Sequence, residues 1–140
     1  MKSPGCVADA SIATSWVLTS QATPLANRIL AEIRSGTPFY VPSLWFLEAA
    51  NSLLLLQRRG KLGVDQCAHA RAAIGRMRPV VDDEGPLQQL QSVWQLAAEL
   101  QLTIYDATYL ELAIRRGAVL ASRDGSLIRA AKKRGILTLS

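Results

Sequence analysis

The sequence predicts an α/β protein: a three-layer α/β/α sandwich with a mostly parallel central sheet. Short apolar segments alternate with longer segments of helical periodicity, and this alternation is typical of a parallel sheet covered by helices on both faces. The 140 residues, of which 49% are hydrophobic, suffice for a substantial core. No repeat, low-complexity tract or long linker divides the chain, so we expect a single domain over residues 1–140.

The alternation can be followed in order along the chain. Apolar segments that predict strands lie at 6–10, 38–42, within 78–85, at 118–122 and at 136–140. Periodic segments that predict helices lie at 11–21, 23–36, 42–59, 64–78, 86–100, 103–116 and 124–134. Glycines end four of these helices, which is the usual stop signal: Gly36, Gly60, Gly117 and Gly135.

Charge and composition narrow the class of protein. Sixteen Lys and Arg against eleven Asp and Glu give a net charge of +5, which suits a polyanionic partner or simply a solvated basic surface. No apolar run reaches the roughly 18 residues of a membrane span. Pro4, Gly5 and Asp9 interrupt the N-terminal segment and argue against a signal peptide. With only Cys6 and Cys67, a disulfide framework is not expected, so we expect a cytoplasmic protein with reduced thiols.

An acidic residue interrupts one of the most apolar segments, "VPSLWFLEAANSLLLLQ". On a helical wheel, Glu48 and Asn51 share a face with Leu44 and Leu55, and the other positions are also largely apolar. Such a helix is expected to be buried on most sides, by the core and, in a dimer, by a second subunit. Because a carboxylate is costly to bury, Glu48 needs a partner. The partner is either an arginine side chain or a ligand that binds in a pocket beside Glu48.

Three aspartates lie where helices begin. Asp9 interrupts the first predicted strand near its end, Asp124 follows the fourth, and Asp106 lies in a first helical turn. Each can be interpreted as a helix cap, and Thr103 with Asp106 fits a capping box. However, ligands of open parallel sheets bind where the strands end and the helices begin. We therefore expect these aspartates and Glu48 to converge on one cleft.

Four convergent carboxylates repel one another unless a cation neutralises them. Carboxylate oxygens suit Mg²⁺ or Mn²⁺. The single histidine, His69, and two cysteines without ligand-like spacing argue against zinc. A carboxylate-held metal ion in a basic protein is the chemistry of phosphodiester hydrolysis, because the metal generates hydroxide and stabilises the leaving oxygen.

Four segments resemble the acidic motifs of PIN domains, most closely those of VapC-type toxins of bacterial toxin–antitoxin pairs. They are "VADASIATSW", "LWFLEAANSLL", "IYDATYLELAIRRG" and "VLASRDGSLIRAAKKRGI", in the family's order over nearly the whole chain. The resemblance implies an α/β/α fold and a Mg²⁺- or Mn²⁺-dependent endoribonuclease. The partners that it implies are an RNA substrate, a cognate antitoxin and a second copy of the chain.

The resemblance also assigns roles residue by residue. The expected catalytic acids are Asp9, Glu48, Asp106 and Asp124. Metal contact is expected from the three aspartates, most directly from Asp9 and Asp106, to one metal ion or two. Glu48 or Asp124 would hold a metal-bound water or act as general base. The supporting polar positions are Ser11, Asn51 and Ser122, the last standing where the family usually has threonine.

Basic residues offer candidate phosphate contacts. Arg123 ranks first because it adjoins Asp124. The clusters at 58–61, 115–116 and 132–134 lie at helix ends, where the helix dipole favours them in any case. The acidic run at 82–84 precedes a Gly-Pro pair and is expected to be a surface turn.

Two other functions remain open at this stage. A phosphatase-like hydrolase would use Asp9 as nucleophile, but its usual second aspartate two residues later is replaced by Ser11. A non-catalytic interaction domain would use the acids only as caps and in salt bridges.

Overall fold

The computed structural model describes residues 4–83 and 85–140. The strands are β1 (Cys6–Ala8), β2 (Phe39–Val41), β3 (Val80–Val81), β4 (Val119–Ala121) and β5 (Thr138–Leu139). The helices are α1 (Ala10–Val17), α2 (Pro24–Arg34), α3 (Leu44–Arg58), α4 (Val64–Arg76), α5 (Pro86–Leu100), α6 (Ile104–Arg116) and α7 (Gly125–Lys133), and a 3-10 turn, η1, spans Thr19–Gln21. Each predicted element is present, with ends that differ by a few residues.

The five described strands form one parallel sheet in the order β3-β2-β1-β4-β5. Successive connections run outward from β1 through β2 to β3, and then return across the sheet to β4 and β5. The order of strands therefore reverses between β1 and β4, where a ligand crevice is expected outside the carboxyl ends of the strands. The residues that directly follow these two strands, Asp9 and Ser122, meet at this point.

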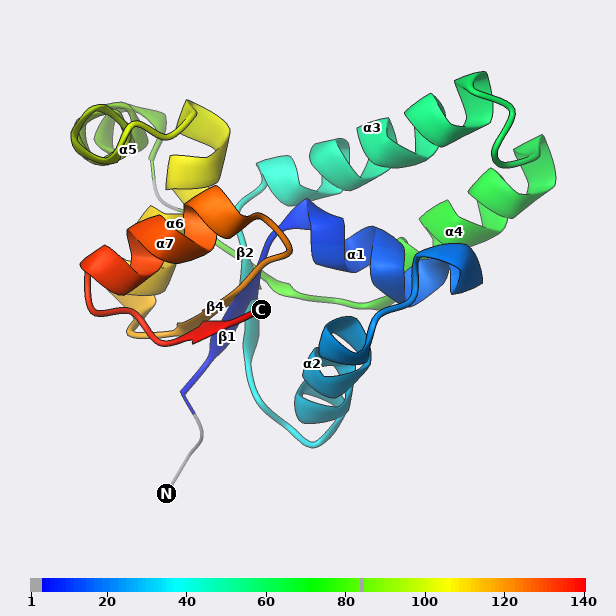
Figure 1. Cartoon of the computed structure of the whole chain (residues 1–140), viewed down its shortest axis with the longest axis horizontal. Coiled ribbons are helices and arrows are strands. Elements are labelled where there is room, and N and C mark those ends of the chain that lie inside the picture. Colours follow the sequence, from blue (N-terminus) through cyan, green and yellow to red (C-terminus); the bar gives the residue numbers. More distant parts are fainter. Residues whose placement is uncertain (1–3, 84) are drawn as a thin grey trace.

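Helices cover both faces of the sheet, as a right-handed crossover requires when the strand order reverses. Helices α1 to α4 pack together on one side, and α5, α6 and α7 lie on the other (Figure 1). Helix α6 crosses β1, β2 and β4 and so forms the centre of its layer. The three-layer α/β/α prediction is confirmed.

The core lies between these layers and explains the apolar strands. Val7, Val41 and Leu120 from the three central strands are fully buried, as are Trp45 of α3 and Tyr109 of α6. No helix in the described parts of the chain combines the length and apolarity that a membrane span needs.

Helix α3 differs from its prediction. Within the chain it buries only Trp45, Ala49 and Leu53, not most of its circumference. Leu47 is 75% exposed and Leu54 is 40% exposed. The apolar composition predicted burial on most sides, but α3 packs on α1 and α4 through one stripe of side chains only.

Candidate functional site: a carboxylate cluster at the strand ends

Asp9 lies at the centre of the site, directly after β1. It is the N-cap of α1, and its Oδ1 accepts the backbone N–H of Ser11 at 3.2 Å. The hydroxyl of Ser11 also donates to Oδ1, and the hydroxyl of Ser122, from the end of β4, donates to Oδ2. Asp9 is only 7% exposed and Ser122 is fully buried. The side chain is therefore fixed from two strands at the point where the strand order reverses.

The turn after β4 brings the next two residues to the same place. The backbone N–H of Asp124 donates to the Ser122 hydroxyl at 2.9 Å. Asp124 caps α7 by accepting the N–H of Ser126 at 2.8 Å. The Arg123 guanidinium donates to the Ser15 hydroxyl of α1 at 3.1 Å, so it lies beside the site.

Helix α6 supplies Asp106 from its first turn. The Thr103 hydroxyl accepts the backbone N–H of Asp106 at 3.1 Å, which confirms the predicted N-cap. The Asp106 side chain is half-buried, and its charge acts on those of Asp9 and Asp124. Asp106 thus lies in the capped first turn of α6 and also near enough to Asp9 and Asp124 for their charges to interact.

The hydrogen-bond partner of Glu48 is a tyrosine. The Tyr109 hydroxyl donates to Glu48 Oε1 at 2.7 Å, joining α3 to α6 across the site. Tyr109 is 1% exposed and lies one turn after Asp106 on α6. Tyr109 was not predicted as a site residue, although its position three residues after Asp106 was a usable signal.

The electrostatics show that the acids act on one another. Burial raises the pKa of the Asp9 carboxyl, against the lowering effect of its two serine donors. Burial also raises the pKa of Glu48, and the charges of Asp106 and Asp9 raise it further while the Tyr109 hydroxyl opposes them. Burial, followed by the charges of Asp124 and Asp9, raises the pKa of Asp106. Each of these carboxyls favours a bound proton or a nearby cation.

The donor set fits a hard divalent cation. Carboxylate oxygens flanked by hydroxyls suit Mg²⁺ or Mn²⁺, and a positive charge would relieve the repulsion that raises these pKa values. Among the described residues, no three or more Asp, Glu, His or Cys side chains stand in an arrangement that could by itself hold a metal ion.

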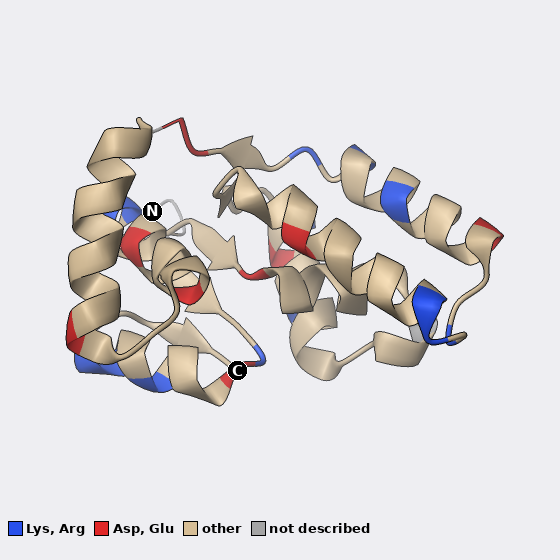
Figure 2. Cartoon of the chain, turned by 90° about the horizontal axis from the view of Figure 1, so that it is seen from above, with Lys and Arg blue, Asp and Glu red and all other residues tan. Residues whose placement is uncertain are grey.

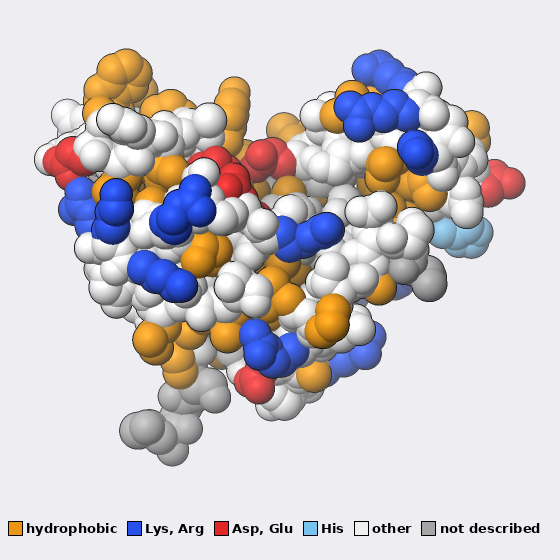
Figure 3. Space-filling model, viewed as in Figure 1, with side chains coloured by type: hydrophobic (Ala, Val, Ile, Leu, Met, Phe, Trp, Pro, Cys, Tyr) orange, Lys and Arg blue, Asp and Glu red, His pale blue; other side chains and the backbone are white. Residues whose placement is uncertain are grey.

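The surroundings of the cluster are visible from two directions. In Figure 2, one acidic position directly follows a central strand and others lie on helices at either side. In Figure 3, acidic side chains line a hollow between the α5–α6 side of the molecule and α3, with basic side chains nearby. Asn51, the third supporting polar position, is solvent-exposed on α3, and no hydrogen bond from it to the acids is found in the described region.

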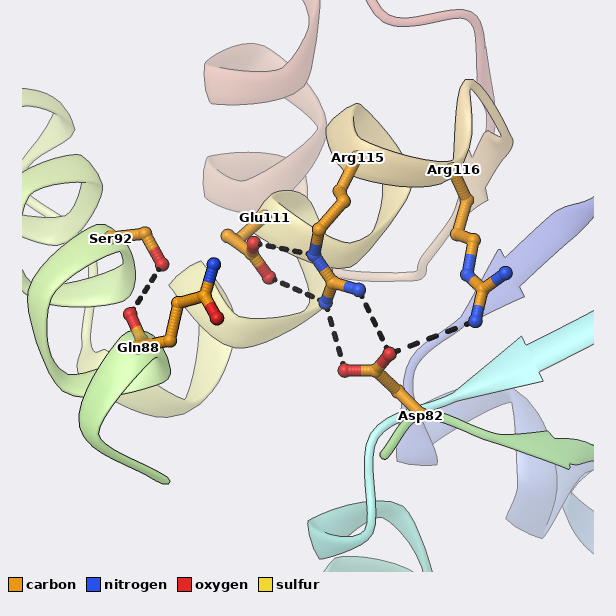
Figure 4. Close-up of polar contacts among 6 residues, drawn as sticks. All are labelled: Asp82, Gln88, Ser92, Glu111, Arg115 and Arg116. Atoms are coloured by element: carbon orange, nitrogen blue, oxygen red, sulfur yellow. Dashed lines mark hydrogen bonds and ion pairs between the residues drawn. The ribbon is translucent and has the colours of Figure 1, made fainter. Parts of the chain in front are cut away.

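The acidic run expected to be a surface turn contains a buried ion pair, so that expectation is wrong for Asp82. Asp82 is 7% exposed and receives Nη1 and Nη2 of Arg115 at 2.9 and 2.8 Å (Figure 4). Arg115 also binds Glu111, and Arg116 lies 3.9 Å from Asp82. These arginines anchor α6 to the end of β3 and are engaged by acids, although their sequence had made them candidate phosphate contacts. Asp83 is exposed, and Glu84 lies outside the described residues.

The chain is an α/β/α protein with a buried aspartate, Asp9, at the switch point of a parallel sheet and with other acids near enough for their charges to interact with one another. A family model for the PIN domain matches residues 6–133, so the chain belongs to the PIN domain family, whose members are generally nucleases. No curated protein sequence matches the chain significantly.

Two solved structures share this fold. Protein PAE2754 from Pyrobaculum aerophilum has a TM-score of 0.69 at 23% identity, covering 99% of this chain and 92% of its own. FitAcB from Neisseria gonorrhoeae has a TM-score of 0.62 at 16% identity, with 96% of each chain covered.

Proposed function

We propose that this PIN domain is a Mg²⁺- or Mn²⁺-dependent endoribonuclease and the toxin of a cytoplasmic toxin–antitoxin pair. The observation that carries the proposal is Asp9: a buried carboxylate at the switch point, held by two serine hydroxyls, whose charge acts on Glu48 and Asp106. A helix cap requires only its own carboxylate, whereas a site for a cation requires several carboxylates near one another.

Each residue of the site has its own proposed role, which follows from its position. Asp9, Asp106 and Asp124 would hold the metal ion, which when bound supplies hydroxide and stabilises the leaving oxygen. Ser11 and Ser122 keep the Asp9 carboxylate in one orientation. Glu48, half-buried and hydrogen-bonded to Tyr109, would accept a proton from water as general base. Arg123 offers a charge to a neighbouring RNA phosphate.

The proposed partners have support on the surface. The exposed leucines of α3, Leu47 and Leu54, give an apolar area that a second copy of the chain would cover. A cognate antitoxin would occlude the acidic hollow, with arginine as the natural side chain to meet carboxylates. Light scattering at tens of micromolar should report a dimer, and a monomer would contradict this part of the proposal.

Cleavage of single-stranded RNA tests the central proposal. The wild-type protein should cleave with Mg²⁺ or Mn²⁺ and stop when EDTA is added. Asp9→Asn should lose activity by a factor of at least about 100, because a metal ligand supports charge that develops in the transition state. Asp83→Asn removes an equal charge at an exposed position and should retain activity.

The same assay separates the alternatives. Release of phosphate from a phosphomonoester, without RNA cleavage, would favour the Asp9-nucleophile hydrolase. Folded wild-type protein with neither activity would favour the interaction domain. Equal RNA cleavage by wild type and Asp9→Asn would remove Asp9 from the mechanism.

A further inference from the structure

A recess adjoins the carboxylate site on the α7 side. It has a volume of about 410 Å³ and shares Ser122 and Arg123 with the site. Its walls include Leu25 of α2 together with Ile128 and Arg129 of α7. Ser122 is the residue whose hydroxyl holds Asp9, so the recess begins where the proposed chemistry takes place.

The recess combines an apolar surface with positive charge. Leu25 and Ile128 supply apolar wall, while Arg123 and Arg129 supply two guanidinium groups. No Asp or Glu side chain is among the described residues that line it, which also include Thr23, Gly125 and Ser140. An apolar surface beside cationic groups fits a nucleotide, which has a flat base at one end and a phosphate at the other.

Both arginines are placed for phosphate contact. Arg123 is exposed and uses Nη1 on Ser15, which leaves further N–H donors of the guanidinium for a ligand. Arg129 is exposed and donates to Ser126 at 3.3 Å through Nη2, so it is held near the start of α7. Planar guanidinium groups bind phosphate oxygens in pairs, which gives orientation as well as attraction.

We propose that this recess binds the nucleotide next to the scissile phosphate, with its base against Leu25 and Ile128 and its phosphate on Arg123 and Arg129. The proposal rests on the proposed function, because its ligand is the RNA substrate. It adds a subsite that would require an unpaired base, since a base in a duplex cannot turn into a recess. Preference for single-stranded RNA follows from it.

Binding measurements on Arg129→Gln test the phosphate contact. Fluorescence anisotropy would follow a mixed-sequence single-stranded RNA in the Asp9→Asn background, which leaves the RNA intact. Lys132→Gln is the matched control, because it removes one charge from the same helix outside the recess. Arg129→Gln should weaken binding about 3- to 10-fold and lower the slope of log K against log salt by about 0.7 more than the control does.

A second arm tests the base contact. Leu25→Ala should weaken RNA binding about threefold or more while leaving binding of tripolyphosphate, which has no base, unchanged. Arg129→Gln should weaken both ligands. This difference between ligands would not arise if Leu25→Ala only loosened the fold, because a general loss would affect both.

The outcomes keep the two proposals distinct. If wild type cleaves RNA but Arg129→Gln binds no more weakly than Lys132→Gln, the recess assignment is overturned and the nuclease assignment stands. If Leu25→Ala weakens RNA and tripolyphosphate equally, the base contact is wrong. If folded wild type neither binds nor cleaves RNA, both proposals fail together.

Discussion

Replacing Asp106 with asparagine should stabilise the metal-free protein. The backbone N–H that Thr103 caps is retained in Asp106→Asn, so the cap itself survives. The substitution removes a half-buried charge whose pKa is raised by burial and by the charges of Asp124 and Asp9. Without metal, this carboxylate opposes folding.

The expected gain is the difference between two terms. Two carboxylates in contact repel by about 4 kcal/mol at an effective dielectric of 20, and distance and solvent screening reduce this to about 1–2 kcal/mol for half-buried groups. Losing an acid from the first turn of α6 forfeits about 0.3–1 kcal/mol of helix-dipole interaction. A net gain of about 1 kcal/mol remains, or roughly 3–4 °C in Tm.

Calorimetry with EDTA, and then with added Mn²⁺, measures the change in Tm that Asp106→Asn causes and the change that the metal causes. Mn²⁺ should raise the Tm of wild type, because it binds only the folded arrangement, and should raise that of Asp106→Asn less. Thr103→Ala provides the opposite control: it removes the cap, should cost about 0.5–2 kcal/mol and should keep the Mn²⁺ response. If Asp106→Asn melts below wild type without metal and Mn²⁺ shifts neither protein, Asp106 is only a cap and the site assignment is wrong.

Three further predictions follow from the contacts of the site and of α6. Tyr109→Phe removes the donor to Glu48 and should lower the rate of RNA cleavage about 10-fold while the fold persists; an unchanged rate would exclude Tyr109 from positioning. Asp82→Asn should lower the free energy of unfolding by about 2–3 kcal/mol, because it leaves Arg115 without its buried partner, whereas Asp83→Asn should change it by less than about 0.5 kcal/mol; equal denaturation midpoints would contradict this. The metal-free protein should become more stable as the pH falls from neutral toward the ordinary carboxyl pKa values of 3.8–4.5. The reason is that carboxyls whose pKa is raised in the folded state bind protons more tightly there than in the unfolded chain. Denaturant titrations that show a steady loss of stability as the pH falls toward these values would refute the prediction.

The fold and the positions of the three candidate aspartates at helix starts followed from local rules. Asp9 and Asp124 were recognisable because each follows an apolar strand and precedes a helix, and strand ends of a parallel sheet share one edge. Asp106 was recognisable through Thr103, since a cap fixes where a helix begins and therefore where its first turn lies. These signals depend on neighbours in sequence.

The partners of Glu48 and Asp82 could not be assigned in the same way. Tyr109 lies 61 residues from Glu48, and Arg115 lies 33 residues from Asp82. Periodicity places a side chain on a face but does not say which distant face it meets. The same limitation explains α3, whose composition suggested burial all round although only one stripe of it packs within the chain.

We propose above all that Asp9, Asp106 and Asp124 form a metal site, and titration calorimetry of Mn²⁺ into the metal-free protein tests this claim most directly. The wild-type protein should bind one or two ions per chain, Asp9→Asn should bind at least about 10-fold more weakly, and Asp83→Asn should match wild type. Folded wild-type protein that releases no binding heat at any Mn²⁺ concentration up to several millimolar, and shows no Mn²⁺-dependent shift in Tm, would contradict the claim.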